Sequence, residues 1–446
     1  MGHIRQLARR LRRVPPPVAL ALIYGGMIVL GTGALMLPVA SAHGLRVMDA
    51  WFTAASAVTI TGLTVIDPAT DLTLFGQAVV LLLVQVSGLG IMTFAVMILA
   101  ALGLPVGMTG RIFLRDDLRQ VSAARLFDLV RVILRVVLVL EAACAIALAF
   151  VFVPQAGLWP GLWHAVFHAV MAFNNAGFTI LPGGLVPLAT DPMINIAIPL
   201  TVIAGGLGYA VLSDLLTVRR WRRFSLHSKL MLTGTAALLA VSVTGFALLE
   251  WSNPATLGGY ESATARLAMS WFQAVTTRSA GFNTVETGDI EEGTALMFVT
   301  LMLIGGGPTS TAGGIKVTTF IVVLLATVAF FRRQEQLRAF GRGIGLEQVM
   351  KVMALTSISL MLVLLGSFML VTTHQGQFLD VLFEVVSALG SSGLSRGLTS
   401  ELDGFGKTVV IALMFVGRIG PLTLGFFLTT RIPPRVRYPS GQIYLG

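Results

Sequence analysis

AVTITGLT (57–64), FNNAGFTI (173–180), TRSAGFNT (277–284) and LGSSGLSR (389–396) are four versions of one short stretch of sequence. Each version has a glycine at the same place: Gly62, Gly177, Gly281 and Gly393. The glycines are spaced by about 110 residues, the residue after each is Leu or Phe, and an aromatic residue stands ten positions before each: Phe52, Phe167, Trp271 and Phe383. Agreement at several columns predicts an internal repeat. We call the four units copies 1 to 4 and the four stretches the glycine segments.

The composition is that of a membrane protein. Of the 446 residues, 55% are hydrophobic and 12% are charged, and the mean hydropathy is +0.85. Soluble domains carry about 25% charged residues. A helix needs roughly 20 apolar residues to cross a bilayer, and several runs are longer: 18–40, 72–102, 191–216 and 404–430. Each glycine segment follows a shorter helical stretch of about ten to twelve residues, which is too short to span.

These patterns predict an all-α integral membrane protein built from four repeats of a membrane helix, a pore helix and a second membrane helix. Irregular backbone at membrane depth is tolerated only when it is buried in protein or lines a wet cavity, so we expect the four copies to converge on one axis. The expected organisation is a cytoplasmic N-terminus, the four copies and a C-terminal tail: 1–17, 18–110, 126–217, 228–331, 347–431 and 432–446.

The placement of charge predicts the orientation. Basic residues cluster in 5–13, 111–135, 219–229, 332–351 and 431–437, each one helical hairpin from the next. The positive-inside rule puts these clusters and both termini in the cytoplasm. The intervening stretches carry fourteen acidic residues and five basic ones, Arg46, Arg266, Arg278, Arg396 and Lys407, a net charge of 5 − 14 = −9. An acidic outer mouth concentrates cations, although outer loops that merely lack basic residues would give the same bias. A nucleic-acid surface is disfavoured by this placement.

The glycine segments have the composition of a carbonyl-lined cation site. The residues before each glycine are small, hydroxylated or amide-bearing and include no carboxylate. Rings of backbone carbonyls can replace the hydration shell of an alkali cation, and glycine permits the left-handed turns that aim carbonyls inward. The C-terminal ends of the preceding helices add partial negative charge. The alternative is that the glycines only allow close helix packing, which leaves the paired half-length helices unexplained.

The segments TITGLT, NNAGFT, RSAGFNT and GSSGLS resemble the four filter loops of the Trk/Ktr/HKT superfamily of potassium transporters. Nearly the whole chain resembles the KtrB subunits of that superfamily. The resemblance implies a pseudo-fourfold pore that transports K⁺, with glycine at position 62 favouring K⁺ where family members with serine there admit sodium. The filter residues that it implies are Val58, Thr59, Ile60, Thr61 and Gly62 in copy 1, Asn174, Asn175, Ala176 and Gly177 in copy 2, Arg278, Ser279, Ala280 and Gly281 in copy 3, and Gly390, Ser391, Ser392 and Gly393 in copy 4.

The resemblance also implies partners. It predicts a homodimer in the plasma membrane, with the tail YPSGQIYLG (438–446) at the dimer interface. It further implies control by a cytosolic nucleotide-binding ring of the RCK type, KtrA-like, and Na⁺ as an activator or co-ion. This chain itself contains no recognisable nucleotide site, so such control requires a separate subunit. We expect neither an organic cofactor nor a transition-metal site.

The second membrane helix of copy 3 is interrupted at IGGGPTSTAGGIK, which we call the glycine-rich break (304–316). Five glycines and Pro308 cannot continue an α-helix. The spacing does not match a phosphate-binding loop, and a plain kink is the remaining alternative. In the family the matching segment is a gate on the cytoplasmic side. The resemblance therefore assigns gating to Gly305, Gly306, Gly307, Thr309, Ser310, Thr311, Ala312, Gly313 and Gly314.

Two cations, Lys316 and Arg418, lie within predicted membrane helices, where charge is costly and usually functional. We expect Arg418 to contact the 305–314 loop and hold it across the pore, partnered by carbonyls and hydroxyls; a tether between helices outside the pore is the alternative. Glu141 and Cys144 are interpreted as packing residues. His164 and His168 are spaced for a metal, but no third ligand accompanies them.

Other functions remain open from the sequence. A secondary transporter would bind another small solute at broken helices in mid-membrane, but it predicts two inverted halves rather than four parallel copies. A sodium-permeable member of the same superfamily is a second alternative. The sequence contains no nucleophile–base pair or metal cluster that would indicate a membrane enzyme.

Overall fold

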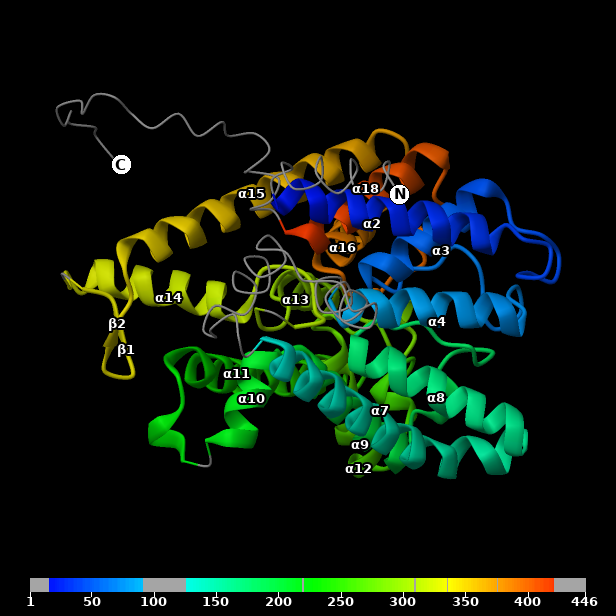
Figure 1. The fold of residues 1–446 in the computed structure, drawn as a ribbon, viewed down its shortest axis with the longest axis horizontal. Helices are drawn as coiled ribbons and strands as arrows, with labels where there is room; N and C mark the ends of the chain where they lie inside the picture. Colours follow the sequence, from blue (N-terminus) through cyan, green and yellow to red (C-terminus); the bar gives the residue numbers. More distant parts are fainter. Residues whose placement is uncertain are drawn as a thin grey trace.

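The computed structural model describes residues 16–90, 126–218, 220–308, 310–334, 336–374 and 376–420. These residues form an assembly of helices (Figure 1). In the described ranges the sheet consists of one antiparallel hairpin, β1 (Arg338–Ala339) and β2 (Arg342–Gly343), with Arg338 opposite Gly343. Residues 1–15, residues 91–125 and residues 421–446, which include the predicted dimer-interface tail, lie outside the described residues.

The helices follow the predicted order in each copy. Copy 1 comprises α2 (Pro16–Leu35), α3 (Val47–Thr59) and α4 (Leu74–Gly88). Copy 2 comprises α7 (Leu126–Ala156), α8 (Leu158–Asn174), α9 (Pro192–Leu207) and α10 (Tyr209–Thr217). Copy 3 comprises α11 (Leu226–Glu250), α12 (Ala263–Thr276), α13 (Glu292–Leu303) and α14 (Val317–Phe331). Copy 4 comprises α15 (Leu346–Val371), α16 (Phe378–Gly390), α17 (Leu398–Glu401) and α18 (Gly404–Ile419). Single 3₁₀ turns lie at Val186–Leu188, Trp221–Arg223, Leu257–Gly259 and Thr287–Asp289.

The short helices before the glycine segments, α3, α8, α12 and α16, have 13, 17, 14 and 13 residues. They are somewhat longer than the ten to twelve residues expected and still short of a membrane span. Three described helices are long and apolar enough to cross a membrane: Ile133–Ala156, Leu226–Glu250 and Leu346–Val371. With the shorter apolar helices of copies 1 and 3, they describe a multi-pass membrane protein.

The second membrane helix of each copy starts at a fixed cap. The side chains of Thr73, Asp191 and Asp403 accept hydrogen bonds from backbone N–H groups in the first turns of α4, α9 and α18. Such caps satisfy donors that the start of a helix leaves unpaired. In copy 3 the carboxylate of Glu250, at the end of α11, accepts from the N–H of Glu291 at 2.9 Å instead. The return from each glycine segment is therefore pinned where the second membrane helix begins.

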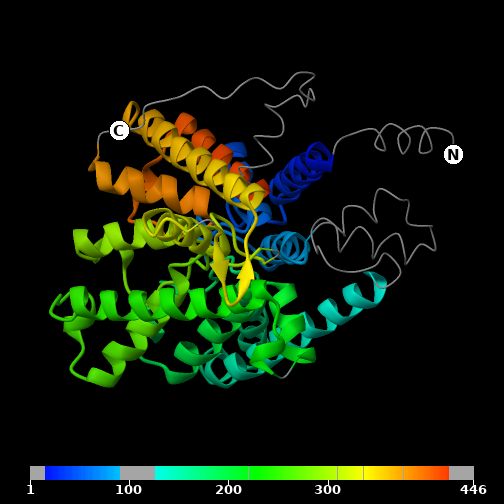
Figure 2. The same cartoon turned by 90° about the vertical axis from the view of Figure 1, so that its left-hand side faces the viewer.

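The four copies contact one another in a closed cycle. The second membrane helix of each copy packs against the short helix of the next, in the pairs α4 with α8, α9 with α12, α13 with α16 and α18 with α3. Figures 1 and 2 show copies 1 and 4 together on one side of the molecule and most of copies 2 and 3 on the other. The C-terminal halves of the short helices are buried, over 52–59, 167–174, 272–276 and 383–390.

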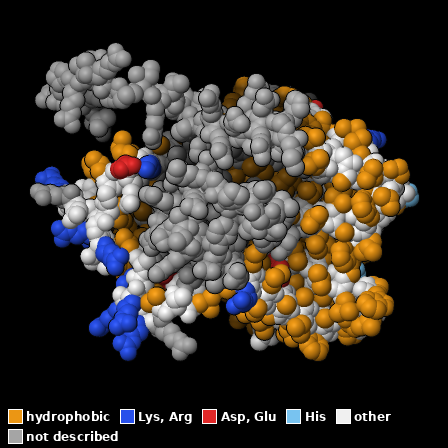
Figure 3. Space-filling model, viewed as in Figure 1, with side chains coloured by type: hydrophobic (Ala, Val, Ile, Leu, Met, Phe, Trp, Pro, Cys, Tyr) orange, Lys and Arg blue, Asp and Glu red, His pale blue; other side chains and the backbone are white. Residues whose placement is uncertain are grey.

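The buried core contains an equivalent aromatic residue in each copy. The aromatic residues ten positions before the glycines are fully buried in copies 1, 2 and 4, as Phe52, Phe167 and Phe383. In copy 3 Trp271 is half-buried and its neighbour Phe272 takes the buried place. Figure 3 shows apolar side chains over most of one end of the molecule and Lys and Arg side chains gathered at the other. Exposed arginines of the second end lie between copies 2 and 3 and around the hairpin: Arg220, Arg222, Arg223, Arg332, Arg333, Arg338 and Arg342.

One expected membrane span is interrupted in the structure. The apolar run 191–216 forms two helices, α9 and α10, bent by 99°. The bend falls at Gly208, whose φ of 88° lies in the left-handed region that helical residues with a Cβ avoid. The runs 72–102 and 404–430 continue beyond α4 and α18 into residues that the structure does not describe.

Candidate functional site

Three of the four short helices end in the same way. Ile60, Asn175 and Ser391 are left-handed, and the N–H of the residue after each donates to a carbonyl five positions back at 2.9 Å. This is a Schellman ending, which normally uses glycine at the left-handed position. A residue with a side chain costs about 1–2 kcal/mol there. Backbone strain repeated at three matching positions is typical of a functional site.

A second left-handed residue follows two positions later in every copy. It is the shared glycine, with φ of 89° at Gly62, 66° at Gly177, 77° at Gly281 and 85° at Gly393. In copy 3 the first left-handed residue is Ser279, with φ of 76°, although its helix lacks the 2.9 Å Schellman bond. Alternate left-handed residues rotate successive peptide planes toward the same side of the chain. Each glycine segment can therefore present a short row of carbonyls to one side.

The glycines meet around a common centre. A Cβ on each glycine would lie closer than 3.0 Å to the carbonyl oxygen that precedes the glycine of another copy: Gly62 to Ala176, Gly177 to Ala280, Gly281 to Ser392, and Gly393 to Thr61. The contacts run from copy 1 to 2, 3, 4 and back to 1. Real Cβ atoms do not approach backbone this closely, so only glycine fits at all four positions.

Short hydrogen bonds hold the segments in place. In copy 1 the hydroxyls of Thr59 and Thr61 lie 2.8 Å apart, and the N–H of Gly62 donates to Ser56 Oγ at 3.0 Å. Copies 3 and 4 are joined directly, because Ser392 Oγ donates to the carbonyl of Thr277 at 3.1 Å and Ser279 Oγ to that of Gly390 at 3.4 Å. These hydrogen bonds hold the segments of copies 1, 3 and 4 in position.

The predicted filter residues divide into two groups. Val58, Thr59, Asn174 and Gly390 belong to the last turns of the short helices, whereas the others form the irregular segments. Arg278, which the sequence analysis also counted among the outer cations, is 8% exposed, and its Nη1 donates to the carbonyl of Thr235 in α11 at 3.4 Å. Its charge therefore belongs to the interior of the protein rather than to an outer mouth.

The expected acidic mouth is smaller than the sequence count. Glu250 and Glu384 are fully buried. Glu250 accepts from Asn253, Thr256 and the N–H of Glu291, and Glu384 accepts from the hydroxyls of Ser395 and Thr399. Two further carboxylates are paired, Asp49 with Lys407 at 2.7 Å and Asp380 with Arg396 at 2.6 Å. These four carboxylates are engaged within the protein, as are Asp191 and Asp403, which cap helices.

The glycine-rich break forms a closed loop beneath the ring. Ile304 and Ile315 form a parallel bridge, and the N–H of Gly305 donates to the carbonyl of Ile315 at 2.8 Å. Gly313 packs so tightly against Ser391 that a Cβ would overlap its side chain. The loop also bonds to copy 2, where Gly307 N donates to the carbonyl of Gly206 at 2.8 Å and Thr311 Oγ1 to that of Phe173 at 3.3 Å. Thr309 lies outside the described residues.

The two cations of the inner half have carbonyl partners. Lys316 Nζ donates within the break, to the carbonyls of Ala312 and Gly313. Arg418, at the end of α18, donates from Nη1 to the carbonyl of Thr311 and from Nη2 to that of Ser87 at 3.2 Å. The expected contact between Arg418 and the break is present. It joins copies 4, 3 and 1, because Ser87 lies at the end of α4.

Sequence analysis missed the role of Glu141. The residue was interpreted as a packing residue, but it is hydrogen-bonded to Gln85 and Asn174, and the latter ends the short helix of copy 2. The only cue was a carboxylate at membrane depth, whose partners are far away in the sequence. Cys144 does pack, with Sγ 3.9 Å from the carbonyl of Ala197.

His168 is a buried structural residue. Its Nδ1 lies 2.7 Å from the carbonyl of His164 and its Nε2 lies 3.0 Å from Thr179 Oγ1. Both ring nitrogens thus have partners in copy 2. Among the described residues no group of three His, Cys, Asp or Glu side chains could hold a metal ion.

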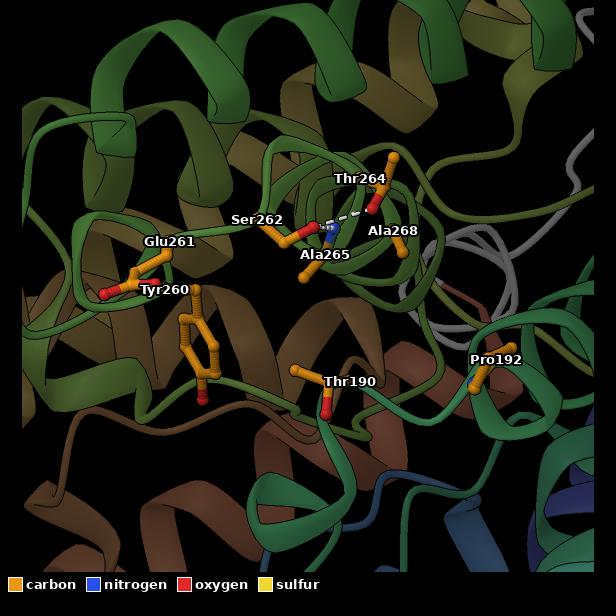
Figure 4. A pocket seen from close by; sticks show the side chains of 8 residues that line it. All are labelled: Thr190, Pro192, Tyr260, Glu261, Ser262, Thr264, Ala265 and Ala268. Atoms are coloured by element: carbon orange, nitrogen blue, oxygen red, sulfur yellow. Dashed lines mark hydrogen bonds between the residues drawn. The ribbon is translucent and has the colours of Figure 1, made fainter.

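A cavity of about 530 Å³ lies away from the ring, between the outer loops of copies 2 and 3. Figure 4 shows its lining residues: Thr190, Pro192, Tyr260, Glu261, Ser262, Thr264, Ala265 and Ala268. Ser262 caps α12 and its hydroxyl lies 2.7 Å from that of Thr264. No residue of the glycine segments lines this cavity, so we do not place it on the path of an ion.

Comparison with known proteins agrees with this architecture. The sequence profile of the TrkH family, described as cation transport protein, matches residues 24–434. Ktr system potassium uptake protein B of Bacillus subtilis is 43% identical over 97% of this chain and 97% of its own. Potassium/sodium uptake protein NtpJ of Enterococcus hirae is 34% identical over 99% of both chains.

The fold has a counterpart among solved structures. The crystal structure of the potassium transporter TrkH from Vibrio parahaemolyticus superposes with a TM-score of 0.72 and 21% identity, covering 93% of this chain and 84% of that one. The family profile and the two relatives confirm the resemblance of the glycine segments at the level of the family. This chain belongs to the TrkH family of cation transport proteins.

Proposed function

We propose that this chain is the K⁺-translocating pore subunit of a potassium uptake system, with four glycine segments arranged in pseudo-fourfold symmetry as its selectivity filter. The observation that carries the proposal is the closed cycle in which each shared glycine abuts the carbonyl of another copy. The names of the relatives support it, since two of the proteins compared above are named for potassium uptake or transport and one for potassium and sodium uptake.

Selection takes place where the carbonyls converge. A dehydrated K⁺ exchanges water oxygens for the carbonyl oxygens of residues such as Thr61, Ala176, Ala280 and Ser392. The short helices end at the same level, and each C-terminus contributes roughly half a negative elementary charge. Four such ends favour a cation without any carboxylate in the filter. The hydrogen bonds behind the ring keep the carbonyls from closing around the smaller Na⁺.

Gating takes place one level below. The glycine-rich break lies directly under the glycine segments of copies 2 and 4, and Arg418 fixes it to α4 and α18. Its guanidinium group adds a positive charge that raises the barrier for K⁺. Opening requires Arg418 to release Thr311, after which the break can leave the path because its glycines and hydroxyls tolerate water.

The remaining assignments belong to the same proposal. Both termini and the arginine-rich end lie in the cytoplasm, by the positive-inside rule. The chain forms a homodimer, is controlled by a separate cytosolic nucleotide-binding ring, and is stimulated by Na⁺. These assignments rest on the resemblance to KtrB subunits.

A sodium-permeable transporter is the second candidate, favoured by the name of the Enterococcus hirae relative. Gly62 argues against it, because family members that admit sodium tend to have serine at that position. The two candidates differ in which ion supports growth or flux.

The direct test is rescue of a bacterial host that lacks its own K⁺ uptake systems. Cells that produce this chain, with membrane insertion confirmed, are expected to grow at low K⁺ and to accumulate K⁺ in preference to Na⁺. Absence of growth despite insertion, also when a regulatory subunit is supplied, would contradict the K⁺ function; equal accumulation of Na⁺ would favour the second candidate.

A further inference from the structure

Three polar side chains from different helices meet inside the membrane domain. Asn174 Nδ2 donates to Gln85 Oε1 at 2.8 Å and to Glu141 Oε1 at 3.4 Å, and Gln85 Nε2 donates to Glu141 Oε2 at 3.2 Å. Asn174 and Glu141 are 0% and 6% exposed. We call Gln85, Glu141 and Asn174 the amide–carboxylate triad. It joins the second membrane helix of copy 1 to the first membrane helix and the short helix of copy 2.

A lone carboxylate is an expensive choice at this depth. Buried charges normally have an oppositely charged partner. In the described part of the chain no Lys or Arg pairs with Glu141, and its oxygens are satisfied by two amides. An apolar residue would pack α7 against α4 at lower cost. The residue is therefore better explained by what it holds than by packing.

The triad holds the start of one glycine segment. Asn174 is the last residue of α8, and the left-handed Asn175 follows it directly. The other copies have Thr59, Arg278 and Gly390 at this position, three residues before the shared glycine. Thr59 bonds to its own segment and helix, Arg278 to a backbone carbonyl of α11, and Gly390 has no side chain. Among these four positions, Asn174 alone is tied by its side chain to the second membrane helix of the preceding copy.

The same turn of α4 also touches the gate. Gly88 lies so close to Asn174 that a Cβ would overlap its side-chain oxygen, and the carbonyl of Ser87 accepts from Arg418. Arg418 in turn holds Thr311 of the glycine-rich break, and Thr311 Oγ1 donates to Phe173, the neighbour of Asn174. The end of α4 thus contacts both Asn174, at the start of the glycine segment of copy 2, and Arg418, which holds the glycine-rich break.

We propose that Gln85, Glu141 and Asn174 are positioning residues that set the affinity of the filter for K⁺ according to where α4 ends, an inference that rests on the function proposed above. When the last turn of α4 lies as in this structure, the triad directs the carbonyls of Asn174 and Asn175 toward the ring. Displacement of that turn removes the hydrogen bonds that Gln85 makes with Asn174 and with Glu141, and lets the segment of copy 2 relax. The affinity of the filter for K⁺ then changes through the glycine segment of copy 2.

An exchange of the two side chains tests this directly. The full chain is reconstituted in liposomes, and the K⁺ concentration that half-saturates flux is measured for Glu141→Gln, Gln85→Glu and the double variant. Loss of a buried hydrogen bond is worth about a factor of ten. Each single variant is expected to raise the half-saturating K⁺ concentration about tenfold. The double variant, which restores one carboxylate and one carboxamide, should return it to within about threefold of the parent.

Two further variants distinguish a change in K⁺ affinity from a general loss of structure. Cys144→Ala removes a buried side chain one turn along α7 that does not touch Asn174, and it should leave the half-saturating concentration unchanged. Gly88→Ala must displace Asn174 without altering the carboxylate, and it should reproduce the increase even where Glu141→Gln is not recovered in the membrane.

Unchanged half-saturation in the single variants and in Gly88→Ala would overturn the inference, as would a loss of maximal rate that the double variant does not rescue. If the parent protein itself carried no K⁺, the proposed function would fail instead. The two failures are therefore distinguishable in one set of measurements.

Discussion

The ring of glycine segments and the layer beneath it differ in how far they keep the repeat. In the ring, all four copies have two left-handed residues in the same register, and the glycine φ angles span only 66° to 89°. Beneath it the copies diverge. The helix α4 ends at Gly88, α9 bends at Gly208, α13 gives way to the glycine-rich break, and α18 ends beside Arg418.

The difference follows from what each layer has to do. A cation is surrounded by oxygen ligands, so selectivity needs equivalent carbonyls from every copy. One obstruction is enough to close an ion path, so a single loop held by a single cation is sufficient for gating. On the proposed function, repetition is retained in the layer that coordinates the ion and lost in the layer that closes the path.

The largest expected effect comes from a methyl group in the ring. Gly177→Ala places a Cβ 2.6 Å from the carbonyl of Ala280 at a φ of 66°, so the carbonyl has to move. We expect K⁺ flux in liposomes to fall by about a hundredfold or more. Gly184→Ala is a matched control, because Gly184 has a φ of 65° and its nearest neighbour lies at 3.7 Å. Equal flux in both variants would show that the ring is not the conducting site.

Gly62→Ser is expected to change selectivity more than rate. The added side chain is directed at the carbonyl of Ala176 and disturbs the carbonyl cage on one side. We expect the ratio of K⁺ to Na⁺ flux to fall by about tenfold, which corresponds to about 1.4 kcal/mol. The measurement is Na⁺ and K⁺ flux under matched gradients. An unchanged ratio would remove Gly62 from the filter.

Arg418→Ala tests the lower layer. It deletes the bonds to Thr311 and Ser87 and the positive charge beneath the ring, so K⁺ flux should rise by about five- to tenfold while the K⁺/Na⁺ ratio stays the same. Arg220→Ala, an exposed arginine outside the ring, should leave both unchanged. If Arg418→Ala altered selectivity but not rate, the separation of filter from gate would be wrong.

The smallest effect is expected at Gly208. Alanine there strains the 99° bend between α9 and α10 by about 1–2 kcal/mol. We expect a lower unfolding temperature in detergent and a K⁺ flux within about threefold of the parent. A flux change as large as that of Arg418→Ala would make copy 2 part of the gate, which is assigned here to copies 3 and 4.

The two layers also differ in how much could be predicted from sequence. The ring could be predicted because glycine has a backbone role that no other residue fills, and it recurs four times at one spacing. The break at 304–316 could be predicted because a helix does not continue through five glycines and a proline. Its contact with Arg418 could be predicted because a cation at membrane depth needs polar partners, which the break supplies. The bend at Gly208 was missed, since a short run of glycines is common in membrane helices that continue.

Side-chain partners far apart in the chain were the harder part. Gln85, Glu141 and Asn174 come from three helices, and nothing local relates them. Arg278, Glu250 and Glu384 were counted as outer charges because their sequence positions suit outer loops, whereas the fold buries them against hydrogen-bond partners. The position of a charged residue in the sequence indicates the side of the membrane on which it lies. Its burial in the fold decides whether an ion can reach it.

The central claim is that carbonyls from four glycine segments select K⁺. Its most direct test is rubidium flux into liposomes that contain only this chain and are loaded with K⁺, with external K⁺ or Na⁺ as competitor. The account predicts that K⁺ competes at least about a hundredfold better than Na⁺, and that Gly177→Ala abolishes the flux while Gly184→Ala preserves it. Equal competition by Na⁺, with the protein shown to be inserted, would contradict it.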